Sequence, residues 1–172
     1  MTTVIRPARL EDARAIAAVH LASWRHELGG SAPPGVLAGL DLSAQQDRVG
    51  KWLLDPQAST LVGEQDGRVE GFITVGHSRD GDADARTGCV VAIYLLPEAL
   101  GRGLGRRLCQ AGLDVLREAG IEQVTLWCLQ ANARGRGFYE HMGFAPDGAT
   151  RVEARLNLPS LRYRMSLVRP GA

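Results

Sequence analysis

The sequence predicts an α/β (α+β) fold, a mixed sheet with helices on both faces. The first observation is the uncharged run Cys89–Leu96, whose aliphatic and β-branched residues are typical of a strand buried on both faces. The second is the glycine turn Gly101–Gly105, which leads directly into a helical repeat of apolar residues. The third is the order of the other elements, strands alternating with helices around one hairpin. A length of 172 residues favours one domain, residues 1–172.

The N-terminal third is predicted to contain one strand and two helices. Residues 3–6 form a short strand that Pro7 closes, and residues 12–28 follow the spacing of a helix. The segment 29–35, rich in glycine and proline, must break that helix. Ser43 is the expected N-cap of a second helix, which Asp55-Pro56 stops after residue 53. Four residues of the first helix lie near one face: Ile16, Val19, His20 and Trp24.

A hairpin and a polar loop precede the central strand. Residues 59–64 and 69–75 flank Asp66-Gly67, a strong signal for a two-residue hairpin turn. Residues 78–88 form a polar loop. Its aspartates would either draw a cationic amine towards the site or, as we prefer, belong to a solvated loop: Asp80, Asp82 and Asp84. Pro97 cannot donate to a sheet ladder, so pairing of the central strand should stop there.

The second half alternates helix and strand. The helix after the glycine turn is followed by an uncharged strand within 121–129 and by a short helix that Asn132 can cap and Gly143 can end. Residues 144–146 begin a strand or turn, and residues 161–167 alternate like a half-exposed last strand. The apolar face of the long helix is expected at Leu104, Leu108, Ala111 and Val115.

The start of the long helix is a predicted anion site. The first turn of a helix has unpaired N–H groups and the positive end of the dipole. Three arginines add positive charge: Arg102, Arg106 and Arg107. Together with the glycines they favour a pyrophosphate as ligand. The alternative is a plain strand-to-helix turn.

Composition narrows the class of protein. The formal net charge is +1, so nothing points to nucleic acid or a membrane as partner. The first residues lack the pattern of a signal peptide, and no apolar run is long enough to span a bilayer. Three cysteines without metal-ligand spacing suggest a reduced, cytoplasmic protein with neither disulfides nor a metal. All three cysteines are expected to be small core residues.

Two motifs together resemble the GNAT superfamily of N-acetyltransferases. Leu100–Gly105 matches the family's Q/R-x-x-G-x-G/A turn, and Asn132–Tyr139, followed by Gly143-Phe144, matches N-x-x-A-x-x-F-Y and G-F. The specific part of the resemblance is residues 89–144. It implies a largely antiparallel sheet of six to seven strands, splayed at the central strands.

The resemblance also implies a reaction and a site. Acetyl-CoA would be the co-substrate, and a primary amine, on a small molecule or a protein, would attack it directly. Tyr139 would be the general acid, and an N–H near Leu95 would hold the thioester oxygen. A homodimer is kept as an open alternative. The residues expected to bind the coenzyme are Ile93, Tyr94, Leu95, Gly101, Arg102, Gly103, Leu104, Gly105, Arg106 and Asn132.

Three positions depart from the family pattern. Leu100 replaces the usual Gln or Arg, and Gly135 replaces the usual Ala, which should loosen the last helix by roughly 1 kcal/mol. Cys89 stands where many relatives have a glutamate that serves as general base. The base is therefore unassigned; His26 and His77 are weak alternatives, better explained as surface residues.

Other interpretations are weighed beside this one. Tyr139 could only pack in the core, and Asn132 could be only an N-cap. A dinucleotide-binding oxidoreductase needs G-x-G-x-x-G, but Arg106 stands at the third glycine, and Glu122 precedes the strand that an acidic residue should follow. No Gly-Lys-Ser/Thr follows the glycines, which excludes a Walker loop. A non-catalytic regulatory module that binds coenzyme A stays open because of Cys89.

Overall fold

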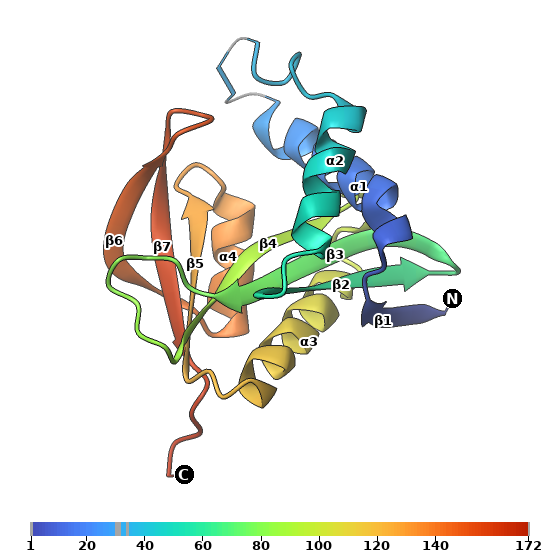
Figure 1. Cartoon of the computed structure of the whole chain (residues 1–172). Helices are drawn as coiled ribbons and strands as arrows, with labels where there is room; N and C mark the ends of the chain where they lie inside the picture. Colours follow the sequence, from blue (N-terminus) through green and yellow to red (C-terminus); the bar gives the residue numbers. More distant parts are fainter. Residues whose placement is uncertain (1, 30–31, 34, 172) are drawn as a thin grey trace.

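A computed structural model describes residues 2–29, 32–33 and 35–171. Within these residues it has four α-helices and seven strands (Figure 1). In chain order they are β1 Thr3–Pro7, α1 Ala13–Leu28, α2 Leu42–Leu53, β2 Ala58–Gln65, β3 Arg68–His77, β4 Thr87–Leu95, α3 Leu104–Glu118, β5 Gln123–Leu129, α4 Ala133–Met142, β6 Ala145–Glu153 and β7 Leu158–Ser166. The helix break expected over 29–35 falls partly on Gly30, Ser31 and Pro34, which lie outside the described residues.

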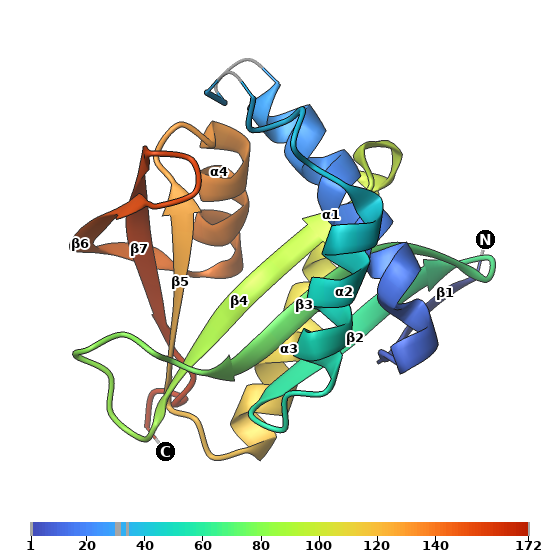
Figure 2. The same ribbon diagram turned by 45° about the horizontal axis from the view of Figure 1, so that its top comes forward.

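The strands form one sheet in the order β1-β2-β3-β4-β5-β7-β6. Every neighbouring pair is antiparallel except β4 and β5, which are parallel. That pair is short, because only residues 87–89 of β4 align with residues 123–125 of β5. Beyond it the two strands separate, as Figure 2 shows. The predicted mixed, largely antiparallel sheet that splays at its central strands is confirmed.

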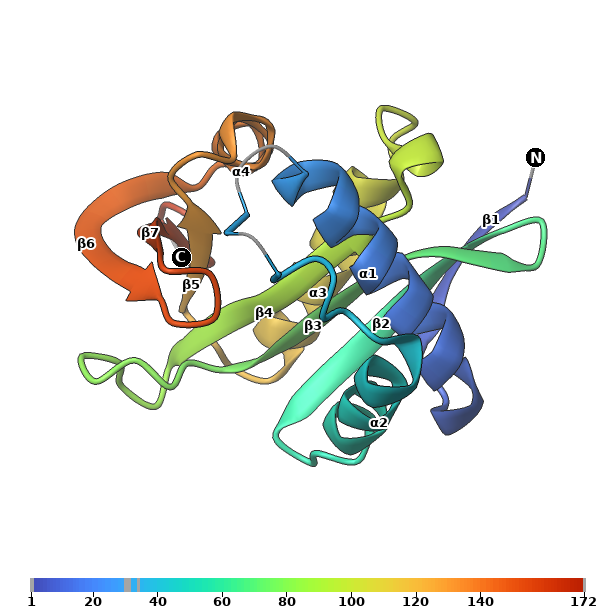
Figure 3. The same cartoon turned by 90° about the horizontal axis from the view of Figure 1, so that it is seen from above.

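Helices cover both faces of the sheet. α1 and α2 lie on one face of β2–β4 and α3 lies on the other, while α4 stands beside β5 (Figures 1 and 3). The inward face of α3 differs slightly from the prediction, since Ala111 and Val115 are only partly buried. The buried residues of α3 are Leu104, Leu108, Cys109, Gly112, Leu113 and Leu116. No helix in the described part of the chain has the length and apolar character needed to cross a bilayer.

Local signals fix most element boundaries. Asp66 and Gly67 form the hairpin turn with φ angles of 49° and 81°, as their sequence predicts. Pro97 follows the end of β4, as expected. The predicted cap of α2 is wrong: Asp41, not Ser43, accepts the hydrogen bond from the Ala44 N–H at 2.8 Å. An aspartate caps as well as a serine does, so the two candidates could not be separated by residue type.

The central strand β4 is less buried than predicted. Val90 and Leu95 are buried, but Val91 is 61% exposed and Ile93 is half-buried. The reason is the separation from β5, which leaves one side of β4 without a neighbouring strand over residues 90–95. The uncharged run Cys89–Leu96 therefore contributes side chains both to the core and to the wall of a cleft.

Candidate active site

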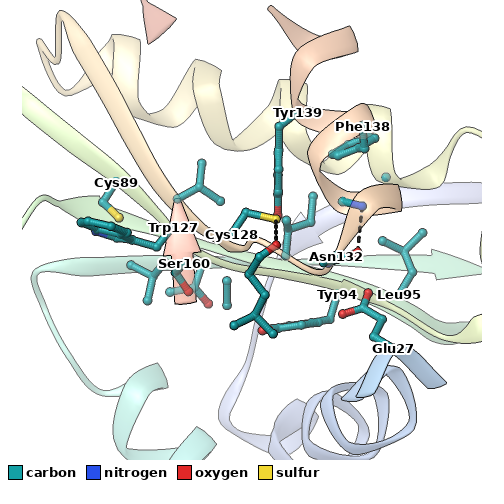
Figure 4. A pocket seen from close by; sticks show the side chains of 18 of the residues that line it. Glu27, Cys89, Tyr94, Leu95, Trp127, Cys128, Asn132, Phe138, Tyr139 and Ser160 are labelled. Carbon is teal, nitrogen blue, oxygen red and sulfur yellow. Dashed lines mark hydrogen bonds between the residues drawn. The ribbon is translucent and has the colours of Figure 1, made fainter. Parts of the chain in front are cut away.

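A cleft of about 920 Å³ opens where β4 and β5 separate (Figure 4). Both strands, the starts of α3 and α4 and the end of α1 line it. The structure brings nine of the eleven predicted site residues to its wall: Ile93, Tyr94, Leu95, Gly101, Gly103, Gly105, Arg106, Asn132 and Tyr139. Arg102 is exposed outside the wall, and the side chain of Leu104 is buried in the core.

The glycine turn forms one end of the cleft. Gly101 and Gly103 have φ angles of 76° and 86°, which only glycine adopts readily, and a Cβ at either position would meet no protein atom within 4 Å. The first backbone bond of α3 runs from the Arg107 N–H to the Gly103 carbonyl. The N–H groups of residues 104–106 therefore have no partner inside the helix. Open space beside these donors fits an anionic ligand.

The arginines at this turn point in different directions. Arg106 lines the cleft, so its charge adds to the positive helix terminus there. Arg107 points away, and its Nη2 lies 3.4 Å from the Thr3 carbonyl oxygen on β1. Of the three arginines that were predicted to form the anion site, only Arg106 lines the cleft.

The free edge of β4 supplies backbone donors. The Leu96 N–H donates to the Glu70 carbonyl on β3 at 2.8 Å. Backbone groups alternate between the two edges of a strand, so the N–H of Leu95 faces the other edge, where β5 has separated. The N–H of Ile93 faces the same way. These donors are available to a ligand that lies along β4 like an added strand.

The Tyr139 side chain projects from α4 into the middle of the cleft (Figure 4). Its ring is held by other aromatic rings, with centroid distances of 5.4 Å to Phe138, 6.1 Å to Phe144 and 6.3 Å to Tyr163. Burial raises the pKa of Tyr139 well above its usual range. The phenol therefore keeps its proton at neutral pH and can donate it to an anion that forms in the cleft.

Asn132 both caps α4 and lines the cleft. Its Oδ1 accepts from the Gly135 N–H at 2.9 Å, so the predicted cap is present. A Cβ at Gly135 would lie 2.5 Å from Asn132 Nδ2, closer than side chains approach. Gly135, which lowers the helix propensity of α4, therefore leaves space for the Asn132 side chain that caps this helix.

Two of the three cysteines lie at the cleft rather than purely in the core. Cys89 is half-buried on β4 and Cys128 is buried on β5, and both touch the cleft. Burial, with a smaller effect of the Asp80 charge, raises the pKa of Cys89 to about 11. Burial also raises the pKa of Cys128 to about 12. Both thiols stay protonated at neutral pH, so neither is a base or a thiolate nucleophile there.

All three tryptophans of the chain line this cleft, which the sequence analysis did not predict. Trp24 donates its indole N–H to the Tyr94 hydroxyl at 3.0 Å. Trp127 donates to the Asp80 carboxylate at 3.1 Å. Trp52 lies near the buried His20 ring, with a centroid distance of 5.9 Å. They come from α1, α2 and β5, so only the fold brings them together.

The polar loop is largely exposed to solvent, as we preferred, and ion pairs and hydrogen bonds also hold it in place. Arg162 on β7 is buried and reaches three carboxylates: Asp82 at 2.6 Å, Asp147 at 2.7 Å and Asp80 at 3.2 Å. Hydrogen bonding to Arg162 holds the pKa of Asp82 at about 2. Arg162 therefore offsets only part of the negative charge of these carboxylates, so the alternative in which Asp80 and Asp82 attract a cationic amine stays open. Asp84 instead bonds the Thr87 hydroxyl at 2.8 Å.

Glu27 is a second residue that the sequence analysis did not single out. It lies in the last turn of α1 and lines the cleft. Figure 4 shows its carboxyl pointing from α1 into the cleft, near Leu95 and below Asn132. Its position three residues after Trp24 puts both on one helix face, a weak signal that could have found it.

Comparison with known proteins finds one family. The model of the acetyltransferase (GNAT) family matches residues 21–144. The chain is 32% identical over 129 residues to the uncharacterized N-acetyltransferase YuaI of Bacillus subtilis, a match that covers 74% of this chain and 72% of that protein. It is 45% identical over 76 residues to a mycothiol acetyltransferase of Beutenbergia cavernae. That match covers 44% of this chain but only 25% of the relative, so the chain spans about a quarter of its length.

Solved structures share the whole fold. The PaiA N-acetyltransferase of Thermoplasma acidophilum, determined in complex with coenzyme A, superposes with a TM-score of 0.78 at 18% identity. The likeness covers 96% of this chain and 99% of that one. At this identity the likeness shows the arrangement of the elements.

Proposed function

Since this chain belongs to the acetyltransferase (GNAT) family, we propose that it transfers an acetyl group from acetyl-CoA to a primary amine by direct attack. The observation that carries the proposal is the cleft between β4 and β5, which has an anion site at one end and a protonated phenol over its middle. We further propose that residues 1–172 act as one domain, since one hydrophobic core includes residues of α1, β2–β5, α3 and β7.

The residues at the cleft fit coenzyme A. The glycine turn and the N–H groups of residues 104–106 would hold the pyrophosphate, with Arg106 adding charge. The free edge of β4 from Ile93 to Leu95 would pair with the pantetheine arm, and Asn132 lies across the cleft from it. Bound there, the coenzyme supplies an acetyl thioester, whose carbonyl carbon is the electrophile.

The chain itself supplies a hydrogen-bond donor and an acid. The Leu95 N–H is directed to the open edge of β4, where it would stabilise negative charge that develops on the thioester oxygen. Tyr139 would protonate the departing sulfur, a role that its raised pKa permits because the phenol is protonated at neutral pH. Cys89 and Cys128 remain thiols, so no acyl-cysteine intermediate is expected.

The acceptor is proposed as a primary amine on a small molecule or a protein. Among the relatives, one group is named for mycothiol and one structural neighbour for the alanine of a ribosomal protein. The tryptophans at the cleft would favour an amine carried on a ring or another apolar body. The cytoplasm is the proposed compartment, on the strength of three free cysteines.

The second candidate function is a coenzyme-A-binding regulatory module, favoured by the cysteine at position 89. A thiol-release screen with acetyl-CoA and a panel of amino sugars, polyamines and peptides with free N termini separates the two. Catalytic turnover of any amine, with formation of the acetamide, supports the transferase. Tight binding of acetyl-CoA without turnover across the panel would favour the regulatory module.

A further inference from the structure

The proposed reaction lacks a proton acceptor. A free alkylamine is mostly protonated near neutral pH, and the ammonium must lose a proton before its nitrogen can attack. Cys89 occupies the position where a glutamate was expected, and its thiol is neutral. The proton must therefore pass to another side chain at the cleft or to water.

Four carboxylates line the cleft, and three of them are already paired. Asp80 accepts from Trp127 and lies 3.2 Å from Arg162. Asp55 lies 3.1 Å from Arg79 and accepts from the Gln57 N–H, and Glu153 lies 3.8 Å from Arg151. Within the described part of the chain, Glu27 is the one cleft carboxylate without an arginine ion pair, and its only side-chain bond is a long one of 3.5 Å from the Ser23 hydroxyl.

The position of Glu27 suits a base. Its carboxyl points from the last turn of α1 towards the Leu95 end of β4, below Asn132 (Figure 4). Its charge acts on groups that surround the middle of the cleft, since it is one cause of the raised pKa values of Tyr94, Cys128 and Tyr139. Glu27 and Tyr139, the proposed acid, therefore lie in the same part of the cleft.

The surroundings of Glu27 favour proton uptake. Although Glu27 is exposed towards the open cleft, desolvation by the protein around its carboxyl raises its pKa, and this effect outweighs the Ser23 hydrogen bond and the charges of His26 and Arg134. A carboxylate with a raised pKa is a stronger base than an ordinary surface glutamate. The titratable or charged groups that face it come from α1, α4, β4 and β5: His26, Arg134, Tyr139, Tyr94 and Cys128.

We propose that Glu27 binds the ammonium of the acceptor and takes its proton, which rests on the proposed function of the cleft. The ammonium and the carboxylate become a neutral amine and a carboxylic acid, and Glu27 later returns that proton to solvent. As the N–C bond forms and the C–S bond breaks, Tyr139 gives its proton to the sulfur. The proton that the new amide nitrogen loses restores the phenol, so all protons are accounted for.

Glu27→Gln tests the assignment, with Glu153→Gln as the matched control at the same cleft. With the amine that turns over best, kcat/KM of Glu27→Gln should fall by about 100-fold or more at neutral pH, while calorimetry gives an unchanged acetyl-CoA affinity. Glu153→Gln should stay within roughly threefold of wild type, because that carboxylate is already beside Arg151.

The pH profile distinguishes a base from a structural residue. In the wild type, kcat/KM should fall as Glu27 is protonated, at the same pH for amines of different basicity. In Glu27→Gln the acid limb should follow each amine's own pKa, and the deficit should shrink as the pH rises. Carbon-13 NMR of the side-chain carboxyls should show one group titrating above the ordinary glutamate range in the wild type and not in Glu27→Gln.

The outcomes separate the two proposals. Wild-type turnover combined with full activity of Glu27→Gln, or with an unchanged acid limb, would overturn the base assignment and leave the transferase intact. Absence of turnover in the wild type would remove the proposed function, and the role of Glu27 with it.

Discussion

At the scale of single residues, Arg106 and Arg107 are neighbours with opposite surroundings. One guanidinium lines the cleft and the other reaches the Thr3 carbonyl oxygen. We expect Arg106→Ala to weaken acetyl-CoA binding by about tenfold, because it removes a cation beside the helix terminus that would hold the pyrophosphate. Arg107→Ala should leave the affinity unchanged. Calorimetric titration at low and high salt measures both, and the loss in Arg106→Ala should shrink at high salt.

Equal losses in the two variants would mean that the arginines act as a general positive field. In that case the direction of the Arg106 side chain would not matter, and the site would be less specific than its geometry suggests.

Residue roles could be predicted from the sequence only where a local motif carries them. The glycine turn, Asn132 and Tyr139 stand in short patterns, and the structure brings all of them to one cleft. Glu27 and the three tryptophans come from α1, α2 and β5, so only the fold brings all four to one cleft. The direction of each arginine could not be predicted either, because adjacent residues on a helix point about 100° apart and the register of α3 against the sheet sets which one faces the cleft.

At the scale of elements, α1 is joined to α2 and β4 through one buried histidine. His20 is 6% exposed, stacks on Tyr94 with a centroid distance of 4.5 Å, and accepts the Gln45 amide at Nδ1 at 2.7 Å. Its Nε2 has no hydrogen-bond partner among the described residues. Burial, aided by the charges of Arg155 and Arg48, lowers the pKa of His20 from 6.5 to about 4.

This histidine should make stability depend on pH. Between pH 6.5 and about 4 the unfolded chain binds a proton at His20 and the folded protein does not, so stability falls as pH falls through that window. The contribution between about pH 7 and pH 5 is roughly 2 kcal/mol of unfolding free energy. Urea unfolding at the two values measures it.

The variant His20→Phe should remove that part of the pH dependence, whatever its stability at neutral pH. His141→Phe is the control, since His141 is exposed. An unchanged pH slope in His20→Phe would show that other groups cause the acid sensitivity.

Element types could be read from the sequence better than element surroundings. The apolar run at β4, the Asp-Gly turn and the glycine that ends α4 specify their elements locally. The exposure of Val91 could not be predicted, because it depends on β5 leaving β4 after three paired residues. The cap of α2 was missed because Asp41 and Ser43 are equally good cap residues.

At the scale of the whole molecule, the separation of β4 and β5 creates the site and the β6–β7 hairpin bounds it. At the tip of that hairpin, Leu156 is only 2% exposed and lines the cleft. The neighbouring Arg155 guanidinium lies 5.1 Å from the centroid of the Trp24 ring on α1. The hairpin therefore reaches across from β7 to α1 on the side where the acceptor would lie.

Loosening this tip should affect the acceptor and spare the coenzyme. We expect Leu156→Ala to raise the KM of the amine several-fold, because a lost buried contact weakens the docking of the tip, while acetyl-CoA affinity stays unchanged. Val152→Ala is the control, since Val152 is exposed on β6. Steady-state kinetics with each substrate varied in turn provides the measurement. If only the KM of acetyl-CoA rises, the hairpin tip contributes to coenzyme binding instead, and the prediction is wrong.

The central claim is that the cleft between β4 and β5 transfers an acetyl group with Tyr139 as the acid. Thiol release by Tyr139→Phe tests it most directly, because that change removes one hydroxyl and keeps the packed ring. The account predicts an unchanged acetyl-CoA affinity and a fall in kcat of about 100-fold or more. A kcat equal to that of the wild type would contradict it.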